Sequence, residues 1–314
     1  MTEVKIGYLL PTRDQAVRGD DDLARLIEQA RHAEAAGFDS LWAGDSPLTR
    51  RRADPLLLLA AVAVAAPRPV LGTAVLLPAL RHPILLAHQL ATLDRLADGR
   101  LIVGMGAGFP TAGTQAQFDA IDVPFRTRVS RLEESIEAMR RLWSGKNVSF
   151  NGRHFTFRDV TLAPTPTRPE GPPIWLAGGG DPALRRVARL ADGWLPYPPA
   201  VTDYARERVT IDRLAPHLIT PALYATLCLG DDPQHARRLL RKSIERYYNA
   251  PLEKVEQIQA MFAGSPAEAA AWLNSYIAAG ARHLVIRLAA DDHHAALDKF
   301  AAQVEPLLNL CEQR

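Results

Sequence analysis

The chain has 314 residues, of which 47% are apolar and 7% aromatic, and its formal net charge is +2. This length fits one large α/β barrel or two ordinary domains. Basic and acidic residues alternate along the chain, which gives no electrostatic footprint for nucleic acid or an anionic membrane, so a small-molecule partner is expected.

The first half of the chain alternates short apolar runs with segments of helical periodicity. Each run reads as a strand, and each periodic segment as the helix that follows it. The predicted pairs are 4–10 with 23–36, 40–43 with 55–65, 70–77 with 83–96, and 101–105 with 126–143.

The second half keeps this alternation but interrupts it twice. Residues 146–173 predict a β-hairpin around an Asn151-Gly152 turn, followed by a proline-rich connector, and residues 249–264 form a second interruption. A helix over 265–280 is expected from Ser265, Pro266 and Glu268, which together resemble a capping box. The remaining strands are predicted at 174–176, 193–195, 222–229 and 283–288. Helices are predicted after three of them, at 182–191, 233–248 and 294–310, whereas a poorly patterned stretch up to 221 follows the strand at 193–195.

Eight strand–helix units in succession predict parallel strands, and eight right-handed crossovers favour a closed (β/α)8 TIM barrel over an open sheet. We expect one barrel domain over 1–314 with inserted segments near 110–124, 147–167 and 249–264. Such barrels carry their active sites at the carboxyl ends of the strands. Functional residues are therefore expected directly after each strand.

The loop after the fifth predicted strand is rich in glycine and leads into a helix. Ala177, Gly178, Gly179 and Gly180 leave the backbone bare, so its N–H groups and the helix amino terminus could hold a phosphate. The alternative is a plain tight turn in which Asp181 caps the helix. Asp181 would also compete with a phosphate for the same donors.

The loops after strands two, three and four add further candidates. Gly106 and Gly108 alternate with other residues after strand four, which could let a flat ring lie against the backbone. Asp45 could orient a cofactor or substrate. The following arginines at 50–52 could face an anionic substrate, but a solvated, exposed loop is the preferred interpretation. His82 could be an acid–base group or a cofactor contact, although a lone histidine before a helix-opening proline is more often structural.

Several other chemistries receive no support from the sequence. Cys228 and Cys311 lie far apart without metal-ligand spacing, and no glycine–serine–glycine nucleophile elbow is present. No metal site is predicted. The run at 4–10 is short and contains Lys5, unlike a signal peptide, and no apolar stretch reaches membrane-spanning length. A cytoplasmic location without membrane contact is expected.

Four blocks of sequence resemble the luciferase-like flavin monooxygenase family across nearly the whole chain. They are AAGFDSLWAGDSP (35–47), LGTAVLLPALRHPILLAHQLATLDRLADGRLIVGMGAG (71–108), PPIWLAGGGDPALRRVARLADGWLP (172–196) and AGARHLVIRL (279–288). Members of this family bind reduced FMN or the deazaflavin coenzyme F(420) in the mouth of the barrel. The resemblance therefore implies a flavin-type oxidoreductase.

The resemblance also implies roles for individual residues. The ring would rest against strand three, where the peptide bond between Ala74 and Val75 would be cis, and the phosphate would sit on the loop 178–180. Asp45 and the segment 106–108 would line the edge of the ring. Two departures leave the proton-transfer residue unidentified: Ser46 stands where several members have histidine, and Ala107 stands where the sugar-phosphate dehydrogenase branch has glutamate. Both departures argue against the sugar-phosphate dehydrogenase branch.

Our main hypothesis from the sequence is an FMN-dependent monooxygenase that oxidises a small organic substrate with dioxygen and receives reduced FMN from a separate flavin reductase. The first alternative is an F(420)-dependent hydride-transfer oxidoreductase, and the second is a flavin-binding protein without catalytic activity. A metal-dependent hydrolase on the same scaffold is a distant possibility. The resemblance also implies a homodimer.

Overall fold

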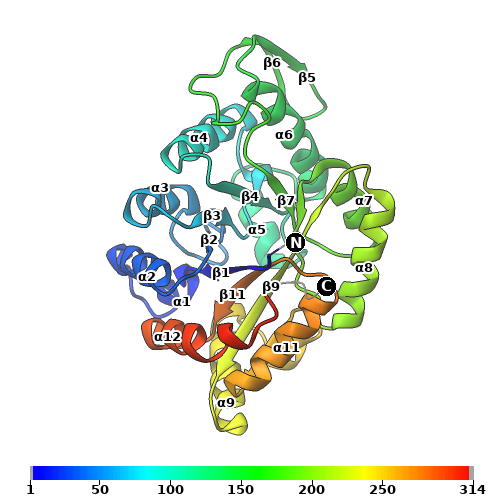
Figure 1. Ribbon diagram of the computed structural model, residues 1–314. Helices are drawn as coiled ribbons and strands as arrows, with labels where there is room; N and C mark the ends of the chain where they lie inside the picture. The colour runs from blue at the N-terminus through cyan, green and yellow to red at the C-terminus, as the bar shows by residue number, and fades with distance from the viewer. Residues whose placement is uncertain (1–2, 311–314) are drawn as a thin grey trace.

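The computed structural model describes residues 3–310 and forms a closed barrel of parallel strands surrounded by helices (Figure 1). The strands run in the order β9-β11-β1-β2-β3-β4-β7-β8, and β8 pairs with β9 to close the ring. The predicted (β/α)8 barrel is confirmed. Its strands are β1 (Lys5–Leu9), β2 (Ser40–Ala43), β3 (Val70–Thr73), β4 (Leu101–Met105), β7 (Ile174–Leu176), β8 (Gly193–Trp194), β9 (Thr220–Leu229) and β11 (His283–Leu288).

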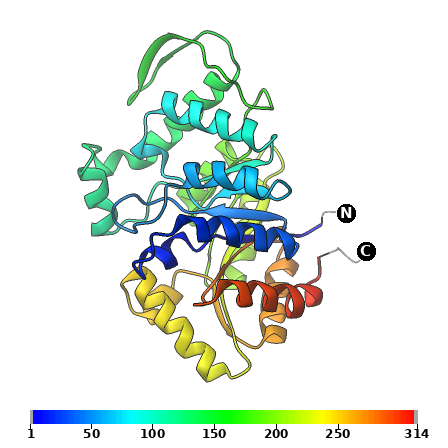
Figure 2. The same ribbon diagram turned by 90° about the vertical axis from the view of Figure 1, so that its left-hand side faces the viewer.

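Helices cover the outside of the barrel on every side (Figures 1 and 2). The larger ones are α2 (Leu23–Ala35), α3 (Pro55–Ala65), α4 (Pro83–Leu96), α6 (Arg128–Trp143), α7 (Asp181–Leu190), α8 (Val201–Leu214), α9 (Pro233–Tyr248), α11 (Pro266–Ala278) and α12 (His293–Gln303). Local sequence signals set several helix starts. The Asp22 side chain caps α2, and Ser265 with Glu268 forms the predicted capping box of α11.

Smaller elements occupy the connections. The predicted hairpin is present as β5 (Val148–Asn151) and β6 (Thr156–Val160), and it projects away from the barrel (Figure 1). The other short elements are α1 (Thr12–Ala16), α5 (Ala112–Asp119), α10 (Leu252–Glu256), β10 (Met261–Gly264), η1 (Pro78–Leu80), η2 (Phe125–Thr127) and η3 (Glu305–Leu307).

Three segments differ from the sequence-based expectation. The third strand ends at Thr73, before the predicted residue 77, and the peptide bond between Ala74 and Val75 that follows it is cis. The poorly patterned stretch after β8 contains a full helix, α8, whose buried side chains include only Tyr204 and Ile211. The second interruption contributes β10, which extends the sheet along β9.

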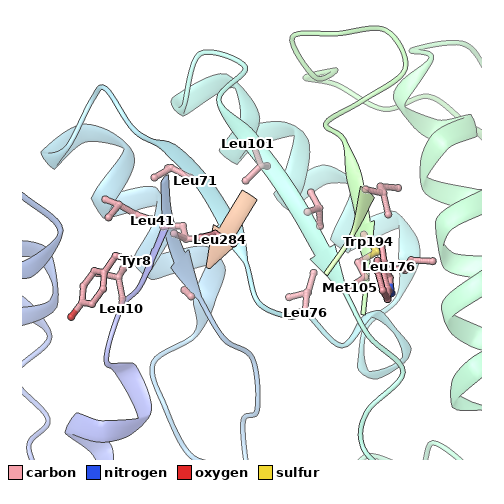
Figure 3. Packing of buried hydrophobic residues seen from close by; sticks show 14 of the residues in the cluster. Tyr8, Leu10, Leu41, Leu71, Leu76, Leu101, Met105, Leu176, Trp194 and Leu284 are labelled. Carbon is pink, nitrogen blue, oxygen red and sulfur yellow. The ribbon is translucent and has the colours of Figure 1, made fainter. Parts of the chain in front are cut away.

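Side chains of the strands alternate between two separate apolar clusters, as expected for strands buried on both faces. Leu41, Leu71, Leu101, Leu176 and Leu284 point outward and pack with the helices (Figure 3). Leu9, Trp42, Trp175, Tyr224 and Val285 point inward and form a smaller cluster inside the ring. The barrel interior is therefore a packed core rather than a pore.

Two tryptophans fill the barrel interior below the carboxyl ends of the strands. Glycines on neighbouring strands leave room for their rings. The rings of Trp42 and Trp175 lie 5.4 Å apart, and an ideal Cβ on Gly72 would come within 2.2 Å of Trp42. A Cβ on Gly193 would come within 2.4 Å of Trp175. This floor leaves the carboxyl ends of the strands as the part of the barrel able to receive a ligand.

His283 completes this floor and gives a prediction for stability against pH. Its ring packs edge-on to both tryptophans and forms a 2.7 Å hydrogen bond with Ser40 Oγ, while burial, and then Lys5, lower its pKa to about 3. The unfolded chain takes up a proton near pH 6.5, so stability present above that pH is lost as the pH falls toward 3. We expect this group to cost about 2 kcal/mol of unfolding free energy between pH 7 and pH 5.

Urea unfolding at these two pH values measures this loss. His283→Gln should show a shallower pH dependence, although His293, whose pKa burial lowers to about 4, keeps contributing in the same direction. Equal pH dependence in the variant and the natural chain would contradict the assignment.

Candidate active site

The loop after β7 presents bare backbone at the mouth of the barrel. Gly178 and Gly180 adopt φ values of 121° and 76°, which side-chain-bearing residues rarely reach. Within residues 3–310, the N–H groups of Gly178 and Gly179 donate to no acceptor; Gly178 is half-buried and Gly179 is exposed. Unpaired amides directly before a helix form an anion-binding concavity.

The start of α7 differs from the turn that the sequence suggested as an alternative. Gly180 occupies the N-cap position and no side chain caps the helix, so the prediction that Asp181 caps it is wrong. The Gly180 N–H instead donates to Glu207 Oε1 of α8 at 2.8 Å. An added Cβ on Gly179 would lie 2.8 Å from the same carboxylate. A negatively charged group thus already lies against this loop.

The end of β3 lies against the end of β4, where glycines make the contact. The Ala74–Val75 bond is cis, as the family resemblance implied, and both residues are half-exposed. A Cβ on Gly104 would lie 2.0 Å from the carbonyl oxygen of Thr73, and one on Gly106 would lie 2.7 Å from Val75 Cγ2. Half-exposed Ala177 lies just after the end of β7. Together with it, these residues form one half of the barrel mouth, in which every side chain is small.

Gly108 lies slightly further along than Gly106. It has φ of 87°, and a Cβ there would lie 3.1 Å from Thr114 of α5. It therefore forms the turn into α5.

Asp45 is turned toward the backbone that follows the cis bond. Its carboxylate forms a 2.5 Å ion pair with Arg81, accepts a second bond from Arg81 at 3.1 Å, and accepts the Leu77 N–H at 3.0 Å. The side chain is only 2% exposed. In this structure Asp45 fixes the segment after β3, and a direct contact with a cofactor stays a prediction.

His82 has a local structural role. Its Nδ1 accepts the Ile84 N–H at 3.3 Å as the N-cap of α4, and its ring packs edge-on to Phe155 of the hairpin connection. Burial, and then the charge of Arg131, lower the pKa of His82. Nothing in these contacts links His82 to the small-residue half of the mouth.

Arginines gather on the rings of two tyrosines at the end of α9. We call this set the arginine cluster; it comprises Arg13 of α1, Arg50 and Arg52 after β2, and Arg287 of β11. The guanidinium of Arg287 lies 4.1 Å from the ring centre of Tyr247, and those of Arg13 and Arg52 lie 5.2 and 5.7 Å from it. Arg50 lies 5.1 Å from the ring centre of Tyr248.

The arginine cluster belongs to the side of the mouth opposite the glycine loop, because β1 and β7 face each other across the ring. Arg50 and Arg52 are half-buried, so the expected solvated loop holds only for exposed Arg51. Among the described residues, Arg287 is the one member of the cluster with a carboxylate partner, Asp14, at 2.6 Å. The mouth is thus divided into a half of small residues and a cationic, aromatic half.

Tyrosines supply the titratable hydroxyls near this cationic half. Burial raises the pKa of half-exposed Tyr197 to about 12, and burial also raises the pKa values of Tyr224 and Tyr248. Tyr197 and Tyr224 lie with ring centres 6.2 Å apart. At neutral pH these hydroxyls keep their protons, so they can donate hydrogen bonds to a ligand oxygen.

No functional role was predicted from the sequence for Arg13, Arg287 or these tyrosines. Arg287 could have been recognised as a functional candidate, because it is a charged residue in a mostly apolar strand. Its place in the alternation puts it on the interior face with His283 and Val285. The tyrosines of α9 come from a distant helix, and no local pattern predicts their place at the mouth.

Comparison with known families settles which group of proteins shares this architecture. A family model described as luciferase-like monooxygenase matches residues 4–283. The chain belongs to this family. Members of the luciferase-like family are flavin- or F(420)-dependent oxidoreductases, so the chain is an enzyme of flavin-type redox chemistry.

Individual relatives of this luciferase-like chain divide between two cofactors. An F420-dependent glucose-6-phosphate dehydrogenase from Kineococcus radiotolerans is 30% identical, with 90% of this chain and 93% of the relative covered. A solved F420-dependent secondary alcohol dehydrogenase in complex with an F420-acetone adduct has a TM-score of 0.81 at 21% identity, over 98% and 99% of the two chains.

An FMN-bound structure is similar in fold as well. The oxygenating constituent of 3,6-diketocamphane monooxygenase from Pseudomonas putida has a TM-score of 0.79 at 19% identity, over 99% and 100% of the two chains. At these identities the solved structures establish the shared fold only. No helix among residues 3–310 is long and apolar enough to cross a membrane.

Proposed function

We propose that the protein is an oxidoreductase that uses coenzyme F(420) to transfer hydride to or from a small organic molecule. The observation that carries this proposal is the divided mouth, in which the small-residue half ends at the unpaired N–H groups of Gly178 and Gly179. The choice of F(420) over FMN follows the sequence relatives, which are F420-dependent dehydrogenases. The FMN monooxygenase that we favoured from sequence becomes the second candidate.

The residues present fit a planar cofactor with a phosphate-bearing tail. Half-exposed Ala74, Val75 and Ala177 offer a face without bulky side chains, and a Cβ on Gly104 or Gly106 would disturb the end of β3. Gly178 and Gly179 supply donors for the phosphate. F(420) would supply the carbon centre that exchanges a hydride.

This chain's own groups would bind, orient and hold protons. Asp45 and Arg81 fix the backbone after the cis bond, which keeps the face for the ring in place. Tyr197 keeps its proton at neutral pH because burial raises its pKa to about 12, and it can donate a hydrogen bond to a carbonyl or alcohol oxygen. Glucose 6-phosphate is a substrate to test because of the relatives' names, although Ala107 departs from that branch.

Titration with each cofactor tests this function. Purified protein is titrated with F(420) and with FMN, and binding is followed by visible absorbance. We expect F(420) to bind at least about tenfold more tightly than FMN and to be reduced when alcohols, including glucose 6-phosphate and 2-propanol, are added. Preferential FMN binding would favour the monooxygenase. Binding of F(420) with no reduction of it by any alcohol, and no oxidation of reduced F(420) by any ketone, would favour a non-catalytic binding protein.

Glu207 should limit the affinity for a phosphate-bearing cofactor. Glu207→Gln is expected to strengthen F(420) binding about two- to fivefold at low salt, because it removes a negative charge beside Gly179 and Gly180. The difference should shrink in high salt. Weaker binding by the variant would show that the carboxylate organises the loop instead.

Formation of a homodimer stays a prediction. Helix α3 exposes Leu57 (76%) and Val64 (74%), and α4 exposes Leu85 (65%), an apolar face of the kind that subunit contacts cover. Sedimentation should give the mass of a dimer, and Leu57→Glu with Val64→Glu should shift it to that of a monomer. A monomeric natural chain would contradict this expectation.

A further inference from the structure

The cationic half of the mouth carries more positive charge than its own acids neutralise. Asp14 pairs with Arg287, but within residues 3–310 no carboxylate forms an ion pair with Arg13, Arg50 or Arg52. Burial, and then the charges of Arg52 and Arg50, lower the pKa of Arg13 to about 10. Grouping like charges costs free energy unless an opposite charge is bound among them.

Buried hydrogen-bonding atoms without partners lie in the same place. Arg287 is 1% exposed, yet its Nε and Nη1 have no hydrogen-bond partner. Thr226, its register partner on β9, is fully buried, and its Oγ1 also lacks a partner. The side-chain oxygen of Gln259, whose amide donates to Tyr248, is a third such atom. Buried polar atoms are normally satisfied, so this concentration points to a ligand.

The arginine cluster reaches the half of the mouth assigned to the cofactor. A Cβ on Gly44 would lie 2.0 Å from Arg52 Nη1 and 3.2 Å from the carbonyl oxygen of Ala74. Arg52 Nη2 also donates to the Tyr247 hydroxyl at 3.3 Å. Arg52 therefore extends from the edge of the cis peptide segment to the tyrosines of α9.

We propose that the arginine cluster binds an anionic group of the substrate, a phosphate or a carboxylate, and thereby orients the rest of the substrate toward the Ala74–Val75 segment. Guanidinium groups suit this task, because their planar donors match both kinds of oxyanion. The rings of Tyr247 and Tyr248, on which the guanidiniums lie, hold the guanidiniums in place and exclude water from them. This inference rests on the proposed function only in naming the bound molecule a substrate.

The cofactor's own phosphate has a separate site. The free amides of Gly178 and Gly179 follow β7, across the ring from β1 and the Arg13 that follows it. Loss of cluster arginines should therefore weaken binding of substrate anions and leave the cofactor's affinity nearly unchanged.

Calorimetric titration of the full chain, with and without F(420), tests the proposal with two probes, inorganic phosphate and citrate. The test variant is Arg50→Gln with Arg52→Gln, since these arginines are half-buried and form no ion pair with any residue that the structure describes. The matched control is Arg51→Gln in the same run, because Arg51 is exposed. We expect the double variant to weaken binding of the preferred probe at least about tenfold and the control to bind as the natural chain does.

The outcomes separate this inference from the proposed function. Unchanged probe binding by the double variant, or no saturable binding of either probe to the natural chain, would overturn the inference. A parallel loss of F(420) affinity in the double variant would also overturn it, since the arginines would then hold the cofactor's tail. If F(420) fails to bind at all but probe binding still depends on Arg50 and Arg52, the proposed cofactor is wrong and the anion subsite stands.

Discussion

Replacing Asp14 with alanine is expected to lower the free energy of unfolding by about 3–5 kcal/mol, as for other buried ion pairs broken on one side. Asp14 and Arg287 are 2% and 1% exposed, and Arg287 Nη2 donates to Asp14 Oδ1 at 2.6 Å. Without the carboxylate, a buried guanidinium would keep only Ser243 Oγ as an acceptor, at 2.8 Å. Urea unfolding at pH 7 measures the loss.

A double variant distinguishes the unpaired charge from damage to the short helix α1. Asp14→Leu with Arg287→Met removes both charges and should recover most of the stability, because apolar replacement of a buried pair is often close to neutral. A double variant as unstable as Asp14→Ala would show that the loss arises from the packing of α1. Arg287→Met should also weaken anion binding, because it removes an arginine of the cluster. The unfolding free energy of the double variant, by contrast, tests only the contribution of the ion pair to folding.

Replacing Gly179 with aspartate is expected to weaken F(420) binding at least about 100-fold, or about 2.7 kcal/mol, while the fold is kept. Gly179, unlike Gly178 and Gly180, is not in the positive-φ region, so its backbone tolerates a side chain. The first atom of that side chain would meet only the end of Glu207. The added carboxylate would lie beside the amides that we assign to the phosphate, and like charges there repel.

Asparagine at the same position is the matched control, since it has the same size without the charge. Gly179→Asn should lose far less affinity than Gly179→Asp, and both variants should melt within about 2 °C of the natural chain. Visible absorbance titration gives the affinities and calorimetry gives the melting temperatures. Equal losses in the two variants would show that shape decides the effect, and the phosphate assignment would fail.

Most of the barrel could be predicted from the sequence because its signals are local. Apolar runs bounded by glycine and proline gave all eight barrel strands, and the capping residues Asp22, Ser265 and Glu268 mark real helix starts. The helix α8 was missed because polar residues cover most of its surface and leave Tyr204 and Ile211 as its buried residues. The strand β10 was missed because four residues give too little periodicity.

The two halves of the mouth were not equally predictable. The glycine loop after β7 is a short motif that the sequence shows directly, and the cis bond after β3 was implied by the family resemblance. The arginine cluster depends on tertiary contacts between α1, the loop after β2, β11 and the end of α9. Neither composition nor spacing predicts that such distant residues lie together. From the sequence, a solvated loop was therefore preferred over a role for Arg50 and Arg52 at an anionic substrate.

The division of the mouth has a consequence for how this enzyme could diverge. Residues 177–180, which we assign to the coenzyme, and Arg287 with the tyrosines of α9, which we assign to the reactant, come from separate stretches of the chain. Substitutions can therefore alter selectivity in descendants while the shared redox chemistry persists. Gly44 is the exception, because a side chain there would meet both Arg52 Nη1 and the carbonyl oxygen of Ala74, so substitution of Gly44 should affect both tasks at once.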